Sequence, residues 1–110
     1  MTSGTALRPT DVIYRDLAQK RVLITGGAAG IGYATAEAFS RQGCRITVFD
    51  IDETGLERAL KSLPGAIGKH GSVTDPDAVN AAFENMDEAF GGVDIVVNNA
   101  GISMNKPTLE

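Results

Sequence analysis

The sequence is poor in the features that mark several large classes of protein. It contains one cysteine, Cys44, no tryptophan, and only 5% aromatic residues in a chain of 110. A single cysteine excludes an internal disulfide framework. The strongly apolar runs, such as 22–24 and 95–97, fall far short of the roughly 20 residues that cross a bilayer. The sequence therefore predicts no membrane span, and residues 1–20 lack the pattern of a secretory signal.

Basic residues are also scarce. Lys and Arg number 10 against 14 Asp and Glu, which gives a formal net charge of -4, and no basic block occurs. Nucleic-acid binders use such a block to neutralise phosphates, so we expect no nucleic-acid partner. No spacing of the single His70 and Cys44 with acidic residues indicates a metal site. Without a signal, a span or disulfides, we expect a cytoplasmic location.

From Lys20 onward, short β-branched runs alternate with longer amphipathic stretches, a pattern typical of a parallel sheet with crossover helices. The sequence predicts strands over 21–25, 45–50, 66–72 and 93–98, and helices over 30–42, 52–62 and 76–90. The last strand is apolar at consecutive positions, so we expect it to be buried on both faces. Residues 1–16 are expected to form a flexible N-terminal arm, and 17–110 the folded domain.

The turn after the first predicted strand is rich in glycine, because residues 25–32 read Thr-Gly-Gly-Ala-Ala-Gly-Ile-Gly. Gly26 would let the chain turn sharply, Gly30 would leave room for a pyrophosphate, and Gly32 would let the helix pack closely. Phosphate would then bind free N–H groups at the helix N-terminus, so the absence of Lys and Arg from the turn is no obstacle. The alternative is that the glycines only make a tight strand–helix connection.

Asp50 closes the second predicted strand, 18 residues beyond Gly32 (50 − 32). A parallel sheet brings this carboxylate beside the glycine turn, where it can accept hydrogen bonds from both hydroxyls of a ribose. The alternative is a solvated acid at a strand end. A 2′-phosphate about 4 Å away would be repelled by up to roughly 4 kcal/mol at an effective dielectric constant of about 20. Because Ala29 and Ile51 stand where an Arg or Lys would offset this repulsion, the sequence predicts NAD over NADP.

These motifs, together with Asn98-Asn99-Ala100-Gly101 at the end of the fourth predicted strand, resemble those of the short-chain dehydrogenase/reductase family. The resemblance covers residues 16–110. It implies the N-terminal half of a doubly wound α/β Rossmann fold with strand order 3-2-1-4, incomplete at its C-terminal end. Right-handed crossovers then place the first two helices on one face of the sheet and the third on the other.

The resemblance also implies an activity and a partner. The expected function is an NAD-dependent oxidoreductase that transfers hydride between nicotinamide and an alcohol or ketone substrate, as a homo-oligomer at full length. The family's Ser, Tyr-x-x-x-Lys pair and catalytic Asn fall beyond Glu110, and neither Tyr14 nor Tyr33 has a Lys four residues later. We therefore expect no catalytic residue within the chain. The alternative is a catalytically inactive dinucleotide-binding fragment from a truncated gene.

The resemblance assigns further cofactor contacts. Ser72 stands where the family usually has an Asp that faces the adenine amino group, and it can still accept a hydrogen bond. Val73 packs on the adenine ring, Asn98 serves the ribose side and the central strand, and Ala100 and Gly101 line the nicotinamide path. The expected cofactor-binding residues are Gly26, Ala28, Ala29, Gly30, Ile31, Gly32, Asp50, Ile51, Ser72, Val73, Asn98, Ala100 and Gly101.

Overall fold

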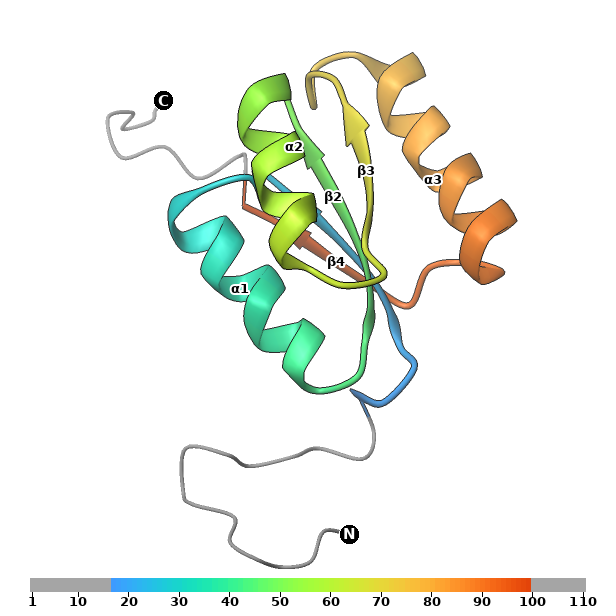
Figure 1. The fold of residues 1–110 in the computed structure, drawn as a ribbon. Helices are drawn as coiled ribbons and strands as arrows, with labels where there is room; N and C mark the ends of the chain where they lie inside the picture. The colour runs from blue at the N-terminus through green and yellow to red at the C-terminus, as the bar shows by residue number, and fades with distance from the viewer. Residues whose placement is uncertain (1–16, 100–110) are drawn as a thin grey trace, which may run out of the picture.

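The structure is a computed structural model that describes residues 17–99, in which one parallel sheet is covered by helices on both faces (Figure 1). In sequence order the elements are β1 (Arg21–Thr25), α1 (Gly30–Arg41), β2 (Arg45–Asp50), α2 (Glu53–Ser62), β3 (Ile67–His70), α3 (Pro76–Phe90) and β4 (Ile95–Asn98). The strand order β3-β2-β1-β4 confirms the predicted order. The predicted arm, residues 1–16, lies outside the described residues.

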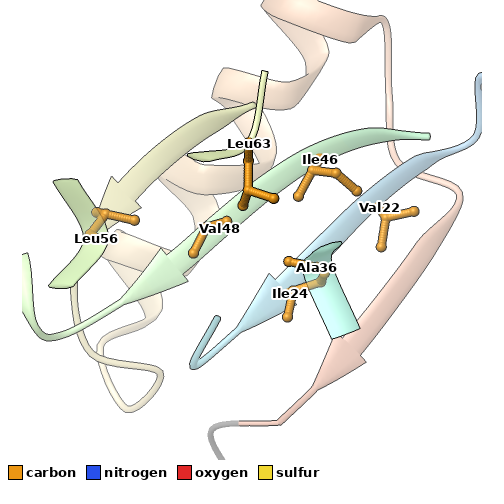
Figure 2. Packing of buried hydrophobic residues seen from close by; sticks show 7 residues of the cluster. All are labelled: Val22, Ile24, Ala36, Ile46, Val48, Leu56 and Leu63. Atoms are coloured by element: carbon orange, nitrogen blue, oxygen red, sulfur yellow. The ribbon is translucent and has the colours of Figure 1, made fainter. Parts of the chain in front are cut away.

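The helices divide between the two faces as predicted. Side chains alternate along each strand, so one face of β1 and β2 packs against α1 and α2 and the other against α3. Figure 2 shows the first of these cores, a cluster of Val22, Ile24, Ala36, Ile46, Val48, Leu56 and Leu63. The second core joins Leu23 and Phe49 to Ala82 and Met86 of α3. Full burial of a Val, Leu, Ile, Phe or Met side chain contributes about 1.5–3 kcal/mol to the stability of the fold.

The ends of the helices follow the local sequence. Asp75 caps α3 by accepting a hydrogen bond from the Asp77 N–H (3.0 Å), and Pro76 occupies the first helical position. Gly43 and Gly91 both have a φ of +86°, the left-handed conformation that ends a helix. These punctuating residues explain why the helix boundaries agree with the predictions to within a residue.

β4 departs from the prediction. It begins at Ile95 and is partly buried on one side only, because Ile95 and Val97 pack against the first core while Val96 is 51% exposed. The prediction of burial on both faces was wrong because α3 packs over β2 and β3. Within residues 17–99 no helix covers the other face of β4.

Parallel pairing aligns the carboxyl ends of the four strands at one edge of the sheet. Thr25 pairs with Phe49 on one side and with Asn98 on the other, and Asp50 pairs with His70. The segments that follow the strands therefore meet at this edge, which we call the carboxyl edge. In doubly wound sheets ligands bind in the crevice outside this edge.

An ion pair joins β1 and β4 at the opposite, amino edge. The Asp94 carboxylate accepts hydrogen bonds from Arg21 Nε (2.8 Å), Arg21 Nη2 (2.8 Å) and the Arg21 backbone N–H (2.9 Å). The Arg21 guanidinium holds the pKa of Asp94 well below its usual range, and Asp94 in turn raises the pKa of Arg21.

None of the described helices is long and apolar enough to cross a membrane.

Candidate functional site

The glycine turn between β1 and α1 forms one wall of the site. Gly26 adopts a φ of +67°, and its N–H donates to the carbonyl of Phe49 (2.7 Å). Gly30 has a φ of +60°, and a Cβ there would meet no atom within 4 Å. At Gly32 a Cβ would overlap the carbonyl of Gly26 and lie 2.7 Å from Asn99 Nδ2. Gly32 thus permits the close approach of α1 to the turn, and Gly30 leaves open space in front of it.

The N-terminus of α1 has no side-chain cap among the described residues. Its N-cap residue, Ala29, is extended (φ −155°), and no acidic residue lies in the first helical turn. The first backbone bond of the helix runs from the Tyr33 N–H to the Ala29 carbonyl (3.2 Å). The N–H groups of residues 30–32 therefore have no partner within the helix, and with the helix dipole they favour an anion.

Asp50 ties the glycine turn to the start of α2. Its Oδ2 accepts a hydrogen bond from the Ala28 N–H (2.9 Å), and its Oδ1 accepts one from the Asp52 N–H (2.9 Å). A carboxylate offers about four lone-pair sites, so each oxygen keeps one for a further donor. The predicted role with ribose hydroxyls is compatible with this geometry and stays a prediction. The anchoring of Ala28 is a second role that the sequence did not predict.

Two asparagines hold the same turn from the β4 side. The Thr25 hydroxyl donates to Asn98 Oδ1 (3.1 Å), and Asn99 Nδ2 donates to the Gly26 carbonyl (3.1 Å). Asn98 thus links β4 to β1. Asn99 was not among the predicted site residues; its place after the fourth predicted strand, next to Asn98, is the signal that could have suggested it. Ala100 and Gly101 lie outside the described residues.

A pocket of about 170 Å³ opens at the carboxyl edge, where β1, β2 and β3 end. Its lining residues are Gly26, Phe49, Asp50, Ile51, Gly71, Ser72 and Val73. The structure thus brings five of the predicted cofactor-binding residues around one hollow. Ile51 and Val73 expose 67% and 39% of their surface, so two apolar side chains stand at the site in contact with solvent. Of the remaining predicted residues, Ala28 is buried within the turn, and Ala29 and Ile31 are exposed where α1 begins.

Two other reactive side chains, Cys44 and His70, are not among the residues that line this pocket. Cys44 is half-buried, its thiol donates to the Leu17 carbonyl (3.1 Å), and burial raises the pKa of the thiol, which disfavours a nucleophilic thiolate. His70 is exposed, with Nε2 3.0 Å from the carbonyl oxygen of Ile51. Within residues 17–99 no group of His, Cys, Asp or Glu is arranged to hold a metal ion.

The fold and the glycine turn define a Rossmann-type α/β domain, a class in which ligands bind at the carboxyl edge of the sheet. Residues 20–110 match the short chain dehydrogenase family, and the chain belongs to this family. The sequence is 40% identical over 87 residues to galactitol 2-dehydrogenase of Agrobacterium fabrum, covering 78% of this chain and 34% of that protein.

Two solved structures show the same fold. L-sorbose reductase of Gluconobacter frateurii, complexed with NADPH and L-sorbose, aligns with a TM-score of 0.74 at 35% identity, covering 82% of this chain and 36% of that one. A short chain dehydrogenase/reductase of Burkholderia phymatum in complex with NAD aligns with a TM-score of 0.71 at 30% identity, covering 76% and 31%. The chain therefore spans about a third of the length of these relatives.

Proposed function

We propose that this chain forms the dinucleotide-binding part of an NAD-dependent oxidoreductase. The observation that carries the proposal is the hydrogen bond from the Ala28 N–H to Asp50 Oδ2 (2.9 Å), which fixes a carboxylate against the glycine turn. An anion-binding turn and a carboxylate side by side match a ligand that has a pyrophosphate next to a ribose. The structural relatives complexed with NAD and with NADPH support this class of ligand.

The start of α1 fits the pyrophosphate. A Cβ at Gly30 would meet no atom within 4 Å, so the side of the turn that a phosphate must approach is free of protein. The N–H groups of residues 30–32 supply the donors, and no acid in the first turn of α1 opposes the negative charge. Neutral N–H groups would therefore hold the two phosphates without a Lys or Arg.

The pocket beyond Asp50 fits the adenosine half. The carboxylate has one lone pair left on each oxygen for the ribose hydroxyls, and the exposed side chains of Ile51 and Val73 offer apolar surface to a base. Gly71 lies between β3 and Ser72, where a Cβ would come within 2.8 Å of Ala78 Cβ. Its lack of a side chain therefore lets the segment that carries Ser72 and Val73 pack closely against α3.

A bound nicotinamide would supply the hydride chemistry, with an alcohol or ketone as the substrate. The residues of this chain then bind and orient the dinucleotide. Asn99 and Asp50 hold the turn from two sides, at Gly26 and Ala28, so that the phosphate site is formed before the ligand arrives. No Tyr of residues 1–110 is followed four residues later by a Lys, so the proton transfer that the family assigns to a Ser and a Tyr-x-x-x-Lys pair is not assigned to any of these residues. The cytoplasmic location and the homo-oligomer stay predictions.

The choice between NAD and NADP tests the proposal. We expect the protein in its natural length to bind NAD at least about tenfold more tightly than NADP, because the 2′-phosphate would lie beside the Asp50 carboxylate. Isothermal titration calorimetry with both dinucleotides measures this ratio. The double variant Asp50→Ala with Ile51→Arg should reverse the preference, since it removes one charge and adds a phosphate partner.

The single variants separate the two roles of Asp50. Asp50→Ala alone should weaken the binding of NAD as well as lower the discrimination, because the Ala28 and Asp52 N–H groups lose their acceptor. Ile51→Arg alone keeps this acceptor and should improve NADP binding with little change for NAD. A native preference for NADP would overturn the assignment of Asp50, and no binding of either dinucleotide would overturn the proposed function.

A further inference from the structure

The base end of the pocket carries a polar group whose hydrogen-bonding role is not fixed. Among the residues that line the pocket, the polar side chains are Asp50 and Ser72. Asp50 is committed to the glycine turn and, under the proposed function, to the ribose. Ser72 follows β3 and is the side chain left to contact the edge of a base in this pocket.

The Ser72 hydroxyl belongs to a small network with Thr74. Ser72 Oγ accepts a hydrogen bond from the Thr74 N–H (3.1 Å), and the two hydroxyl oxygens lie 2.7 Å apart, so either hydroxyl can be the donor. The Asp75 N–H donates to the Ser72 carbonyl (3.0 Å), which closes the turn that holds both residues. The position of Ser72 Oγ is therefore fixed, while the direction of its proton is not.

The two directions give Ser72 opposite roles toward a ligand. When the Ser72 hydroxyl donates to Thr74 Oγ1, its oxygen already accepts from the Thr74 N–H and keeps one lone pair, so it can accept from an amino group. When the Thr74 hydroxyl donates instead, both lone pairs of Ser72 Oγ are used and its own proton is free, so it can donate to a carbonyl oxygen. The change needs only the rotation of two hydroxyl protons.

We infer that the base pocket accepts purine dinucleotides with either a 6-amino or a 6-oxo group, because Ser72 serves as acceptor for the first and donor for the second. This inference rests on the proposed function, since it concerns the base of the same dinucleotide. A carboxylate at position 72 would be an acceptor only, and it would leave a 6-oxo group facing a second acceptor. The Ser72 hydroxyl, which can donate or accept, thus lets the pocket bind either base.

The test compares NAD with nicotinamide hypoxanthine dinucleotide, in which a 6-oxo group replaces the 6-amino group. The dissociation constants of the protein in its natural length are measured by calorimetry, independently of turnover. We expect the two values to agree within about threefold, since Ser72 forms one hydrogen bond in either case. In Ser72→Asp we expect NAD to bind at least about tenfold more tightly than the hypoxanthine analogue.

Two further variants serve as controls. Thr74→Val keeps the N–H bond to Ser72 Oγ and leaves Ser72 with one lone pair and one proton, so the ratio should stay within about threefold. Ser40→Asp adds the same charge near the C-terminal end of α1, ten residues from Gly30 (40 − 30) and so about 15 Å along the helix axis. It should leave the ratio unchanged.

Each outcome decides the question. A native protein that binds NAD at least about tenfold more tightly than the analogue would overturn the inference and leave the proposed function standing. An unchanged ratio in Ser72→Asp would also overturn it, because Ser72 would then not contact the 6-position. Failure to bind either dinucleotide would overturn the proposed function and the inference with it. If Ser72→Asp does not fold, as judged by circular dichroism, Ser72→Ala takes its place: it should weaken the binding of both dinucleotides, and unchanged affinities for both would overturn the inference.

Discussion

Three helices begin at the carboxyl edge of the sheet, but their first turns are built in opposite ways. Asp52 caps α2 by accepting a hydrogen bond from the Gly55 N–H. Asp75 caps α3 by accepting one from the Asp77 N–H. Each also has an acid in its first turn, at Glu53 and Asp77. α1, whose N-cap residue is Ala29, has neither a capping side chain nor an acid in its first turn among the described residues.

The difference between α1 and the other two helices means that the positive end of the helix dipole is not neutralised by a side chain at α1. A capping side chain typically stabilises a helix by about 1 kcal/mol, so α1 forgoes a stabilisation that its two neighbours have. In exchange, its N-terminal N–H groups stay free to bind an anion. The contacts of Asp50 and Asn99 compensate by holding the turn through Ala28 and Gly26 while leaving those groups open.

The strongest way to break this comparison is to fill the space in front of α1. Gly30→Val should abolish dinucleotide binding, because the new side chain would occupy the open side of the turn where the pyrophosphate approaches. Calorimetry with NAD measures the loss. The φ of +60° at Gly30 also makes any side chain strained, by roughly 1–2 kcal/mol, so stability must be measured in parallel.

Gly65→Val is the matched control for that strain. Gly65 has a φ of +79°, and a Cβ there also meets nothing within 4 Å, but it lies after α2 at the opposite end of the helix from Asp52. Both variants should lose similar stability in urea unfolding, and only Gly30→Val should lose NAD binding. Unchanged NAD affinity in Gly30→Val would show that the glycine turn is a structural connection only.

A smaller effect follows from making α1 resemble its neighbours. Ala29 is extended, with φ −155° and ψ 171°, the conformation in which an N-cap Asp accepts from the helix. Ala29→Asp should raise the free energy of unfolding by about 1 kcal/mol and weaken NAD binding at least about tenfold, because its carboxylate repels the phosphates. Urea unfolding and calorimetry on one sample measure both.

Asp75→Ala provides the reverse change. It removes the cap of α3, so the free energy of unfolding should fall by about 1 kcal/mol while NAD affinity stays the same. If Ala29→Asp gains stability without losing affinity, the uncapped start of α1 is not the phosphate site. A gain of stability in Ala29→Asp and a loss in Asp75→Ala, with weaker NAD binding in Ala29→Asp alone, would support the comparison of α1 with α3.

The sequence predicted most of the fold because its local signals agree with one another. Gly43 and Gly91 end helices, Asp75 with Pro76 begins one, and the apolar runs indicate the strands. The strand order came from the family resemblance, and the handedness of the crossovers then gave the face of the sheet that each helix covers. β4 was predicted less well. Its consecutive apolar residues indicated burial on both faces, but burial depends on where α3 packs, which no pattern within 95–98 specifies.

The structure brings several of the predicted residues around one pocket, and their role in binding a cofactor stays a prediction. The glycine spacing and the strand ends pointed to Gly26 and Asp50, the family resemblance pointed to Ser72, and the contacts between the residues were not predicted. The bond from Asn99 to Gly26 joins residues 73 apart, and that from Ala28 to Asp50 joins residues 22 apart. Such contacts depend on the side-chain conformations that form once the strands have paired, so a sequence pattern does not determine them.

The smallest predicted effect lies at the amino edge and sharpens the comparison from the other side of the sheet. The Arg21–Asp94 pair is far along the strands from the starts of the helices, so Asp94→Asn should leave the affinity for NAD unchanged. It should lower stability modestly at neutral pH, because the pair is partly exposed and screened by solvent. Urea unfolding at low and high salt measures this change, with the exposed acid Glu57→Gln as the charge-matched control.

The pH dependence of that variant has a definite sign. Because Arg21 lowers the pKa of Asp94 in the folded protein, Asp94 contributes stability above its unfolded pKa of about 3.9 and loses it as the pH falls toward the lower folded value. The native protein and Asp94→Asn should therefore differ in stability at pH 7 and converge as the solution is acidified below about pH 4. A difference that persists undiminished at pH 2 would show that Asp94 acts through packing or its backbone contact to Arg21, since protonation would then cost nothing. A loss of NAD affinity in the same variant would mean that the two edges of the sheet are coupled, and the contrast between α1 and its neighbours would no longer account for binding by itself.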